Sequence, residues 1–191
     1  ASSRLPRDRA KLVAMVSQNP QFPANSTVQD TVLMGRNPYI GILGSETKTD
    51  FKIALESMHS TGIAALANRT IDQLSGGERQ RVALAMALAQ KTPIILLDEP
   101  TSNLDLAHQP ATLAMFKNIT KSGRTVVAAI HDLTLAAQFS HEIALIGDGY
   151  CQQAGPPEKV ITEKNIYQAY GATVKIFSHP DSNMPVVVNS I

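Results

Sequence analysis

Short aliphatic runs alternate with segments of helical spacing along most of this chain. The runs are bounded by polar or turn residues and cover Leu12 to Ser17, Pro93 to Asp98, Arg124 to Ile130 and Glu142 to Ile146. Such runs predict strands buried in a parallel sheet. Helical spacing covers Val28 to Gly35, Asp50 to Thr61, Gly76 to Gln90, Ala111 to Lys121 and Leu133 to Phe139. Strands joined through helices predict an α/β fold, a mostly parallel sheet flanked by helices with right-handed crossovers.

One stretch, residues 18–74, interrupts the alternation. It carries helical patterns with no clear strand between them, which predicts a helical subdomain inserted into the sheet domain. We therefore expect an α/β core made of residues 1–17 and 75–191, with residues 18–74 as the inserted helical part.

The C-terminal part has a third pattern. Gly147-Asp148-Gly149 lies between two apolar stretches and predicts a β-hairpin. Two short helices are expected over Glu158 to Ile161 and Glu163 to Tyr170. A terminal pair of strands is expected over Thr173 to Phe177 and Pro185 to Val188.

Composition limits the classes of partner. Seventeen Lys and Arg against sixteen Asp and Glu give a formal net charge of +1, so no overall field favours nucleic acid or an anionic membrane. The single Cys151 excludes an intramolecular disulfide and suits a reducing compartment. No apolar run reaches the roughly 20 residues of a spanning helix. We expect a globular protein, 43% hydrophobic, whose membrane contact, if any, is peripheral.

The run from Ile94 to Leu97 ends in two adjacent carboxylates, Asp98 and Glu99, and Pro100 then prevents the strand from continuing. Ligands of open parallel sheets bind beyond the carboxyl ends of the strands. Asp98 is therefore a candidate to hold Mg²⁺, directly or through water. Glu99 is a candidate to orient or deprotonate an attacking water. The alternative is a solvated acidic loop that follows a strand.

Ser75-Gly76-Gly77 directly precedes a long helical pattern. Backbone N–H groups at a helix N-terminus form an anion site, and two glycines let a phosphate approach the backbone closely. The alternative is a simple cap, because Ser75 and Glu78 have the spacing of a capping box. The two interpretations use the same local geometry and are compatible.

Two further side chains are expected at the same edge of the sheet. His131 follows the run that ends at Ile130, and an imidazole there could bind a phosphate or position Glu99. Gln18 follows the run that ends at Ser17, and its amide could reach a metal or the water. Taken alone, each could equally be a structural residue.

With these residues in this order, the chain resembles the ATP-binding subunit of an ABC transporter. The resemblance implies a P-loop NTPase-like fold. The resemblance covers the whole chain. The matching segments are the signature motif, Leu74 to Glu78 with Arg79-Gln80-Arg81, the Walker B motif, Ile94 to Glu99, the D-loop, Ser102 to Asp105, the switch histidine, His131, and the Q-loop glutamine, Gln18.

A finer resemblance is to importers of iron-siderophore, haem or cobalamin. It rests on Gly35-Arg36-Asn37-Pro38, on Leu104 to Gln109, and on Gly155-Pro156-Pro157-Glu158 with Val160.

The resemblance implies an ATPase that uses ATP and Mg²⁺ and works as a homodimer. Each ATP would lie between the P-loop of one subunit and the signature residues of the other. Nucleotide contacts are thereby implied for Ser75, Gly76, Gly77, Glu78 and Asp105. The helical insert and the loop after Gln18 would contact transmembrane permease subunits. The protein would therefore be a peripheral protein at the cytoplasmic face of the inner membrane. No nucleic acid is implied as a partner.

The chain departs from the family pattern at two places. No Gly is followed five residues later by Gly-Lys, so the Walker A loop is missing. We expect the chain to be N-terminally truncated and inactive by itself. Pro110 falls after the D-loop, where the family continues a helix, so that helix is expected to begin near it or to be kinked.

Two other functions are compatible with the same motifs. The first is a non-catalytic interaction module that keeps the signature and partner-binding surfaces but does not bind ATP alone. The second is an ATPase of the DNA-repair or chromosome-organising class. That class normally carries a long coiled coil before the signature motif, and the sequence contains no sustained heptads.

Overall fold

The computed structural model describes residues 6–23, 25–41, 44–101 and 109–190, the side chains of 109–111 excepted. The chain divides into two compact units, Ala1–Ala129 and Ile130–Ile191. Each unit has its own hydrophobic core. None of the helices that the structure describes combines the length and the apolar composition that a bilayer crossing needs.

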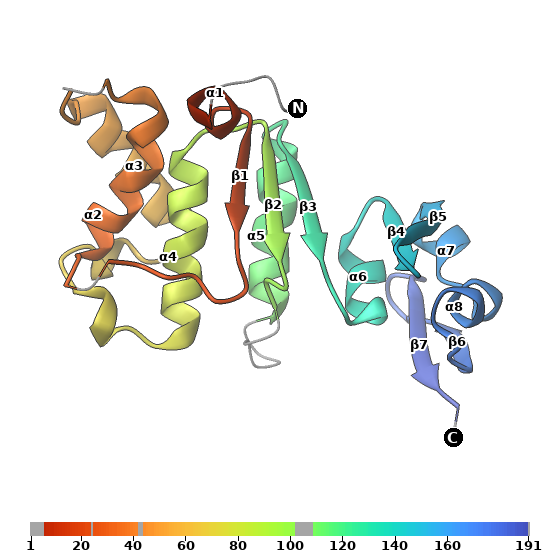
Figure 1. Ribbon diagram of the computed structural model, residues 1–191. Helices are drawn as coiled ribbons and strands as arrows, with labels where there is room; N and C mark the ends of the chain where they lie inside the picture. Colours follow the sequence, from red (N-terminus) through yellow and green to blue (C-terminus); the bar gives the residue numbers. More distant parts are fainter. Residues whose placement is uncertain (1–5, 24, 42–43, 102–108, 191) are drawn as a thin grey trace. The chain divides into compact units, whose positions relative to one another are not determined.

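The first unit contains a three-stranded parallel sheet in the order β1-β2-β3 (Figure 1). The strands are β1 (Val13–Val16), β2 (Ile94–Asp98) and β3 (Thr125–Ala129), and a short helix, α1 (Pro6–Ala10), precedes β1. Met15, Leu96 and Val127 lie side by side in the register. The first three aliphatic runs are therefore strands of one parallel sheet, as predicted.

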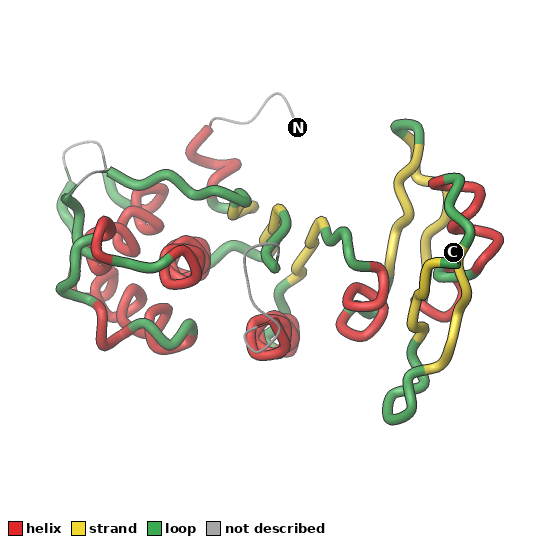
Figure 2. The backbone as a smooth tube through the Cα atoms, turned by 90° about the horizontal axis from the view of Figure 1, so that it is seen from below, coloured by secondary structure: helices red, strands yellow, loops and turns green. Residues whose placement is uncertain are grey.

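Two helices cover only one face of this sheet (Figure 2). They are α4 (Gly76–Ala89) and α5 (Gln109–Lys121), and Val16 and Leu97 are buried on the side that they cover. On the other face Met15 is 63% exposed and Val127 is 53% exposed. The expectation of buried strands is therefore wrong for Met15 and Val127. Pro110 lies in the first turn of α5, where proline is tolerated.

The stretch between β1 and α4 is helical, as expected. It contains α2 (Val28–Leu33), α3 (Lys48–Ser60) and the 3₁₀ helices η1 (Met34–Tyr39), η2 (Ala64–Leu66) and η3 (Ile71–Gln73). Capping begins both α helices: the Thr27 side chain accepts from Asp30 N, and Thr47 forms a capping box with Asp50.

Helix α4 shares its core with these helices. Val82 and Ala85 of α4 pack with Val28, Val32 and Met58 of the helical stretch, all of them buried. Helix α4, which begins within the signature motif and is called the signature helix below, thus lies between the helical stretch on one side and the sheet on the other (Figure 1). The division into residues 18–74 and the rest stays a prediction.

The second unit combines α6 (Leu133–Phe139), β4 (Ile143–Gly147), β5 (Tyr150–Gly155), α7 (Pro157–Val160), α8 (Glu163–Tyr170), β6 (Val174–Ser178) and β7 (Pro185–Asn189). The predicted hairpin, the two short helices and the terminal strand pair are present. Its core includes Leu145, Val160, Ile161 and Ile166.

The expectation for the fourth aliphatic run, Glu142 to Ile146, is wrong. This run is β4, which does not join the parallel sheet but pairs antiparallel with β5 in a two-stranded sheet. Asp148 and Gly149 have φ values of 51° and 81°. Two successive left-handed residues form the tight turn that brings the next strand back alongside, so this local pairing is what the described residues show.

Candidate functional site

The two carboxylates lie where strand β2 ends. Asp98 is the last residue of β2 and is exposed, and Glu99 is half-buried. The amide of Glu99 donates to Ala129 O at 3.1 Å, which continues the pairing with β3 by one residue. Glu99 then adopts φ of 46°, a left-handed conformation that is uncommon for a residue with a side chain. Such conformations persist where the surroundings fix them, often at functional sites.

Gln18 and Glu99 are brought together across the sheet. Gln18 lies two residues beyond β1, which is the neighbour of β2. Its side-chain amide Nε2 donates to Glu99 Oε2, although the two residues are 81 positions apart in the sequence. Both parallel strands end at the same edge, so this contact follows from the topology that the sequence predicted.

The residues at this edge fit a magnesium ion that is held only partly by protein. Gln18 uses its amide nitrogen on Glu99, which directs the amide oxygen elsewhere, and Asp98 offers an exposed carboxylate. No group of three or more His, Cys, Asp or Glu side chains suited to a metal occurs among the described residues. Mg²⁺ characteristically binds one or two protein oxygens and takes its other ligands from water and phosphate.

The N-terminus of α4 is closed by a complete capping box. The Ser75 hydroxyl accepts from Glu78 N at 3.3 Å, and Glu78 Oε2 accepts from Ser75 N and from Ser75 Oγ, both at 2.8 Å. The hydrogen bond from the Ser75 amide, followed by that from its hydroxyl, lowers the pKa of the Glu78 carboxyl. The capping interpretation is confirmed, and the ionised Glu78 complements the positive end of the helix dipole.

The capping box leaves the glycine backbone accessible. Gly76 is exposed, Gly77 is half-buried, and a Cβ added at Gly76 would meet no atom within 4 Å. The first N–H groups of a helix point out of its N-terminus and have no partner within the helix. Cap and anion site are therefore compatible here, and phosphate binding by Ser75, Gly76 and Gly77 stays a prediction.

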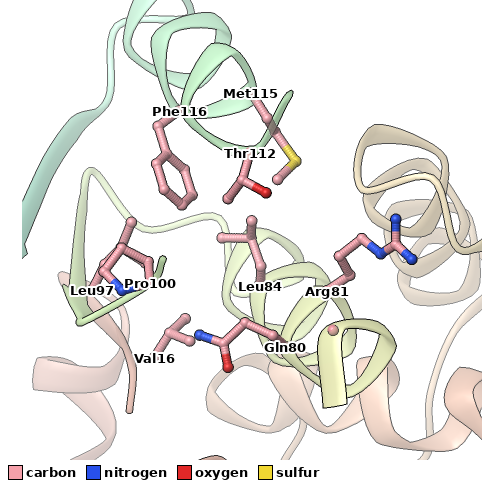
Figure 3. Close-up of a pocket in the computed structure, with 10 residues that line it drawn as sticks. Val16, Gln80, Arg81, Leu84, Leu97, Pro100, Thr112, Met115 and Phe116 are labelled. Carbon is pink, nitrogen blue, oxygen red and sulfur yellow. The ribbon is translucent and has the colours of Figure 1, made fainter. Parts of the chain in front are cut away.

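A small cavity lies under this helix end, between α4, α5 and the strands (Figure 3). Its volume of about 20 Å³ leaves room for about one water molecule. Apolar side chains form most of its wall, among them Leu84, Leu97 and Phe116. The Nε atom of Arg81, which also lines it, is buried with no hydrogen-bond partner in the part of the chain that the structure describes.

Sequence reasoning missed this face of α4. Gly77, Gln80, Arg81 and Leu84 all line the cavity, at the spacing i, i+3, i+4 and i+7 of a single helix face. That periodicity was present in the sequence and could have identified Gln80 and Arg81 as neighbours of the Walker B segment.

Two predicted site residues lie outside the part of the first unit that the structure describes. His131 is exposed and belongs to the second unit, where the adjacent Asp132 caps α6 by accepting from Leu135 N at 2.9 Å. Asp105 lies outside the described residues, together with the rest of the D-loop. Their roles stay predictions.

The sequence matches that of known transport proteins. Residues 3–102 match the family model described as ABC transporter. The chain is 41% identical to the hemin import ATP-binding protein HmuV of Gloeobacter violaceus, over 95% of this chain and 68% of the relative. It is 40% identical to the iron(3+)-hydroxamate import ATP-binding protein FhuC of Bacillus subtilis, over 94% of this chain and 67% of the relative.

A third relative is longer. The cobalamin import ATP-binding protein BtuD of Halobacterium salinarum is 43% identical over 90% of this chain, but this chain spans only 43% of its length.

Solved structures agree with the fold. A structure assigned to the metal-chelate type of ABC transporter, in an inward-facing conformation, has a TM-score of 0.84 at 26% identity, covering 94% of this chain and 73% of that chain. The dimeric structure of a bacterial ABC transporter cassette has a TM-score of 0.69 at 30% identity, covering 78% and 65%. The parallel sheet with flanking helices is therefore the P-loop NTPase-like fold that was expected, and the chain belongs to the ABC transporter family of ATP-binding proteins.

Proposed function

We propose that this chain is the energy-coupling ATPase part of an importer for a metal chelate of the iron-siderophore, haem or cobalamin type. The observation that carries the proposal is the contact between Gln18 and Glu99 beside Asp98, at the carboxyl edge of the sheet. It joins an amide and two carboxylates at the place where nucleotide chemistry occurs in open α/β sheets. The printed names of the relatives, which are hemin, iron(3+)-hydroxamate and cobalamin import proteins, support the class of solute.

Each residue has a defined role in this proposal. Asp98 and the amide oxygen of Gln18 would hold Mg²⁺, which supplies charge neutralisation at the phosphates when bound. Glu99 orients a water and accepts its proton. Its contact with Gln18 fixes the carboxylate in place before ATP arrives. His131 would stabilise the terminal phosphate.

The proposed assembly is a homodimer on permease subunits. Ser75, Gly76 and Gly77, with Glu78 and Asp105, would contact a nucleotide bound mainly by the second subunit. The dimeric cassette among the similar structures and the names of the import relatives support this arrangement. The location would be the cytoplasmic face of the inner membrane, held there by the permease.

The test uses the natural full-length protein with its permease. Glu99→Gln keeps the shape of the side chain but removes the proton acceptor, so ATP binding should remain while hydrolysis falls by at least about a hundredfold. Glu142→Gln is the matched control, because Glu142 is exposed, lies in the second unit and belongs neither to the proposed site nor to the helical stretch. Wild-type turnover in Glu99→Gln would refute the role of Glu99.

A second candidate is the non-catalytic interaction module. It is favoured by one observation, that the 191 residues contain no Gly followed five residues later by Gly-Lys. Calorimetric titration of this chain with Mg-ATP separates the two candidates. A micromolar affinity would contradict a module that does not bind ATP alone.

A further inference from the structure

A single buried cation, Arg36, joins three helices. Arg36 is 6% exposed and belongs to η1. Its Nε donates to Asp50 Oδ1 in the first turn of α3 at 2.9 Å, and its Nη1 donates to the carbonyl oxygen of Ala89, the last residue of α4, at 2.8 Å. Fifty-three positions separate Arg36 from Ala89 in the sequence. The guanidinium therefore ties the helical stretch to the far end of the signature helix.

The anionic partner of Arg36 is itself held firmly. Asp50 Oδ2 accepts from the Thr47 hydroxyl at 2.7 Å and from the Thr47 amide at 3.0 Å. The hydroxyl of Thr47 first, and then Arg36, lower the pKa of the Asp50 carboxyl to about 2. Asp50 is thus ionised at neutral pH, and its position is set by the start of α3. A buried pair of this kind contributes geometry more than net stability.

Tyr39 adds a second tie at the same end of α4. Its ring centroid lies 4.0 Å from Cζ of Arg36, and its hydroxyl donates to the carbonyl oxygen of Gln90 at 2.9 Å. The side chain of Gln90 in turn donates to Ala10 O, and to Val13 O at 3.2 Å. The last carbonyls of a helix have no partner within it. Here η1 supplies those partners, and a positive charge is favourable at this end of the helix dipole.

The geometry of these contacts requires arginine. The planar guanidinium donates in two directions while its face stacks on Tyr39, which a lysine ammonium cannot reproduce. Helix α4 has 14 residues and is therefore about 21 Å long. Its other end carries Ser75, Gly76 and Gly77. A rigid helix transmits a displacement of η1 and α3 at its C-terminal end to its N-terminal end.

We propose that Arg36 is a positioning residue, which couples the helical stretch to the signature glycines through the junction that Arg36, Asp50 and Tyr39 form with Ala89 and Gln90. The inference rests on the proposed function for its catalytic consequence, but the mechanical coupling stands separately. A force that reaches the helical stretch would reorient Gly76 and Gly77 through α4. The side-chain hydrogen bonds of Arg36 go to Asp50 and Ala89, which are not among the proposed nucleotide-binding residues.

The experiment measures hydrogen exchange along α4 in Arg36→Lys. This variant keeps the positive charge but removes the planar guanidinium that donates in two directions. The amides of residues 79–82 bond to the carbonyls of residues 75–78, as Arg79 N does to Ser75 O at 3.0 Å. We expect these amides to exchange at least fivefold faster in Arg36→Lys. The control is Arg9→Lys, an exposed arginine of α1, which should leave them unchanged. Faster exchange confined to η1, α3 and the last turn of α4 would overturn the coupling.

A second variant covers the possibility that Arg36→Lys does not fold. Tyr39→Phe removes only the hydroxyl bond to Gln90 and keeps the stacked ring, so it should accelerate the same amides about twofold. No acceleration at residues 79–82 in Tyr39→Phe would overturn the proposal in that case.

Kinetics of the full-length protein then separate this inference from the proposed function. In Arg36→Lys we expect kcat for ATP to fall about tenfold while KM changes less than twofold, because the signature acts after the nucleotide has bound. Equal changes in both would overturn the positioning role. If wild-type protein lacks ATP turnover but the exchange result holds, the proposed function fails and the coupling remains.

Discussion

The two ends of helix α4 are held by different means. At the N-terminus, Ser75 and Glu78 cap each other across three positions. At the C-terminus, Arg36 and Tyr39 reach the carbonyls of Ala89 and Gln90 from more than 50 positions away. One end is closed by local sequence and leaves its glycine backbone accessible. The other end is closed by tertiary structure and depends on how the helical stretch packs.

This difference assigns separate tasks to the two ends. A local cap forms wherever the helix forms, so the signature end keeps its shape as the rest of the subunit moves. A cap made by side chains of another segment forms only when that segment is docked. The C-terminal end is therefore where polar side chains of the helical stretch close the helix, and the N-terminal end is where a displacement of the helix would be used.

The largest expected effect is at the C-terminal end. A Cβ on Gly35 would lie 2.3 Å from the carbonyl oxygen of Met86 and 3.2 Å from Cβ of Ala89. Gly35→Ala therefore forces η1 and α4 apart, and we expect it to lower the free energy of unfolding of the first unit by about 3 kcal/mol. Urea denaturation, with hydrogen exchange to localise the change, checks this. A loss below about 1 kcal/mol would mean that the two backbones can separate easily.

The second largest effect is expected from acid, which should weaken the contact between Arg36 and Asp50 at the C-terminal end of α4. Because the pKa of Asp50 is lowered from 3.8 to about 2 in the folded protein, its ionised form stabilises the fold at pH values above about 4. That contribution is lost as the pH falls from about 4 to 2 and amounts to about 2 kcal/mol at most. Stability measured against pH should show this fall, and Asp50→Asn should remove it. A fall of equal size in Asp50→Asn would assign the effect to another group.

The sequence predicted one end of α4 and not the other. The spacing of Ser75 and Glu78 is a local signal, and the capping box is present as predicted. The segment with Arg36 shows only a family resemblance in the sequence, because nothing local indicates that its guanidinium meets Asp50 and Ala89. Contacts between distant segments depend on packing, which periodicity does not encode.

The same distinction holds for the fold and for the site. Apolar runs identified the strands, and their order brought Gln18 to Glu99. The runs did not reveal that Met15 and Val127 are exposed, because a continuous apolar run does not show which face of the sheet is covered by helices. The hairpin of β4 and β5 is present as predicted, but the same apolar run does not also join the parallel sheet among the described residues, because an apolar run does not identify the sheet to which it belongs.

Removing the local cap should have a smaller effect than disturbing the C-terminal end. Ser75→Ala loses the side-chain oxygen that accepts from Glu78 N, and helix N-caps are typically worth about 1 kcal/mol. The pKa of Glu78 should also move back up toward its ordinary value, because the hydroxyl that helps to lower it is gone. Denaturation and NMR titration measure the two effects. The control is Ser60→Ala, which removes an exposed hydroxyl bonded to Glu56 O and should lower the free energy of unfolding by less than about 0.5 kcal/mol.

The smallest effect on stability is expected at Gly76, where it should also reverse sign. The position is exposed and has open space around an added Cβ, so Gly76→Ala should stabilise the unit by up to about 0.5 kcal/mol through the lower entropy of the unfolded chain. The same methyl group would lie between a phosphate and the helix N-terminus, and ATP turnover of the full-length protein should fall. Gly35→Ala and Gly76→Ala are the same substitution made near opposite ends of one helix. If Gly76→Ala leaves turnover intact, that glycine does not approach the nucleotide, and the accessible end of α4 has only a structural role.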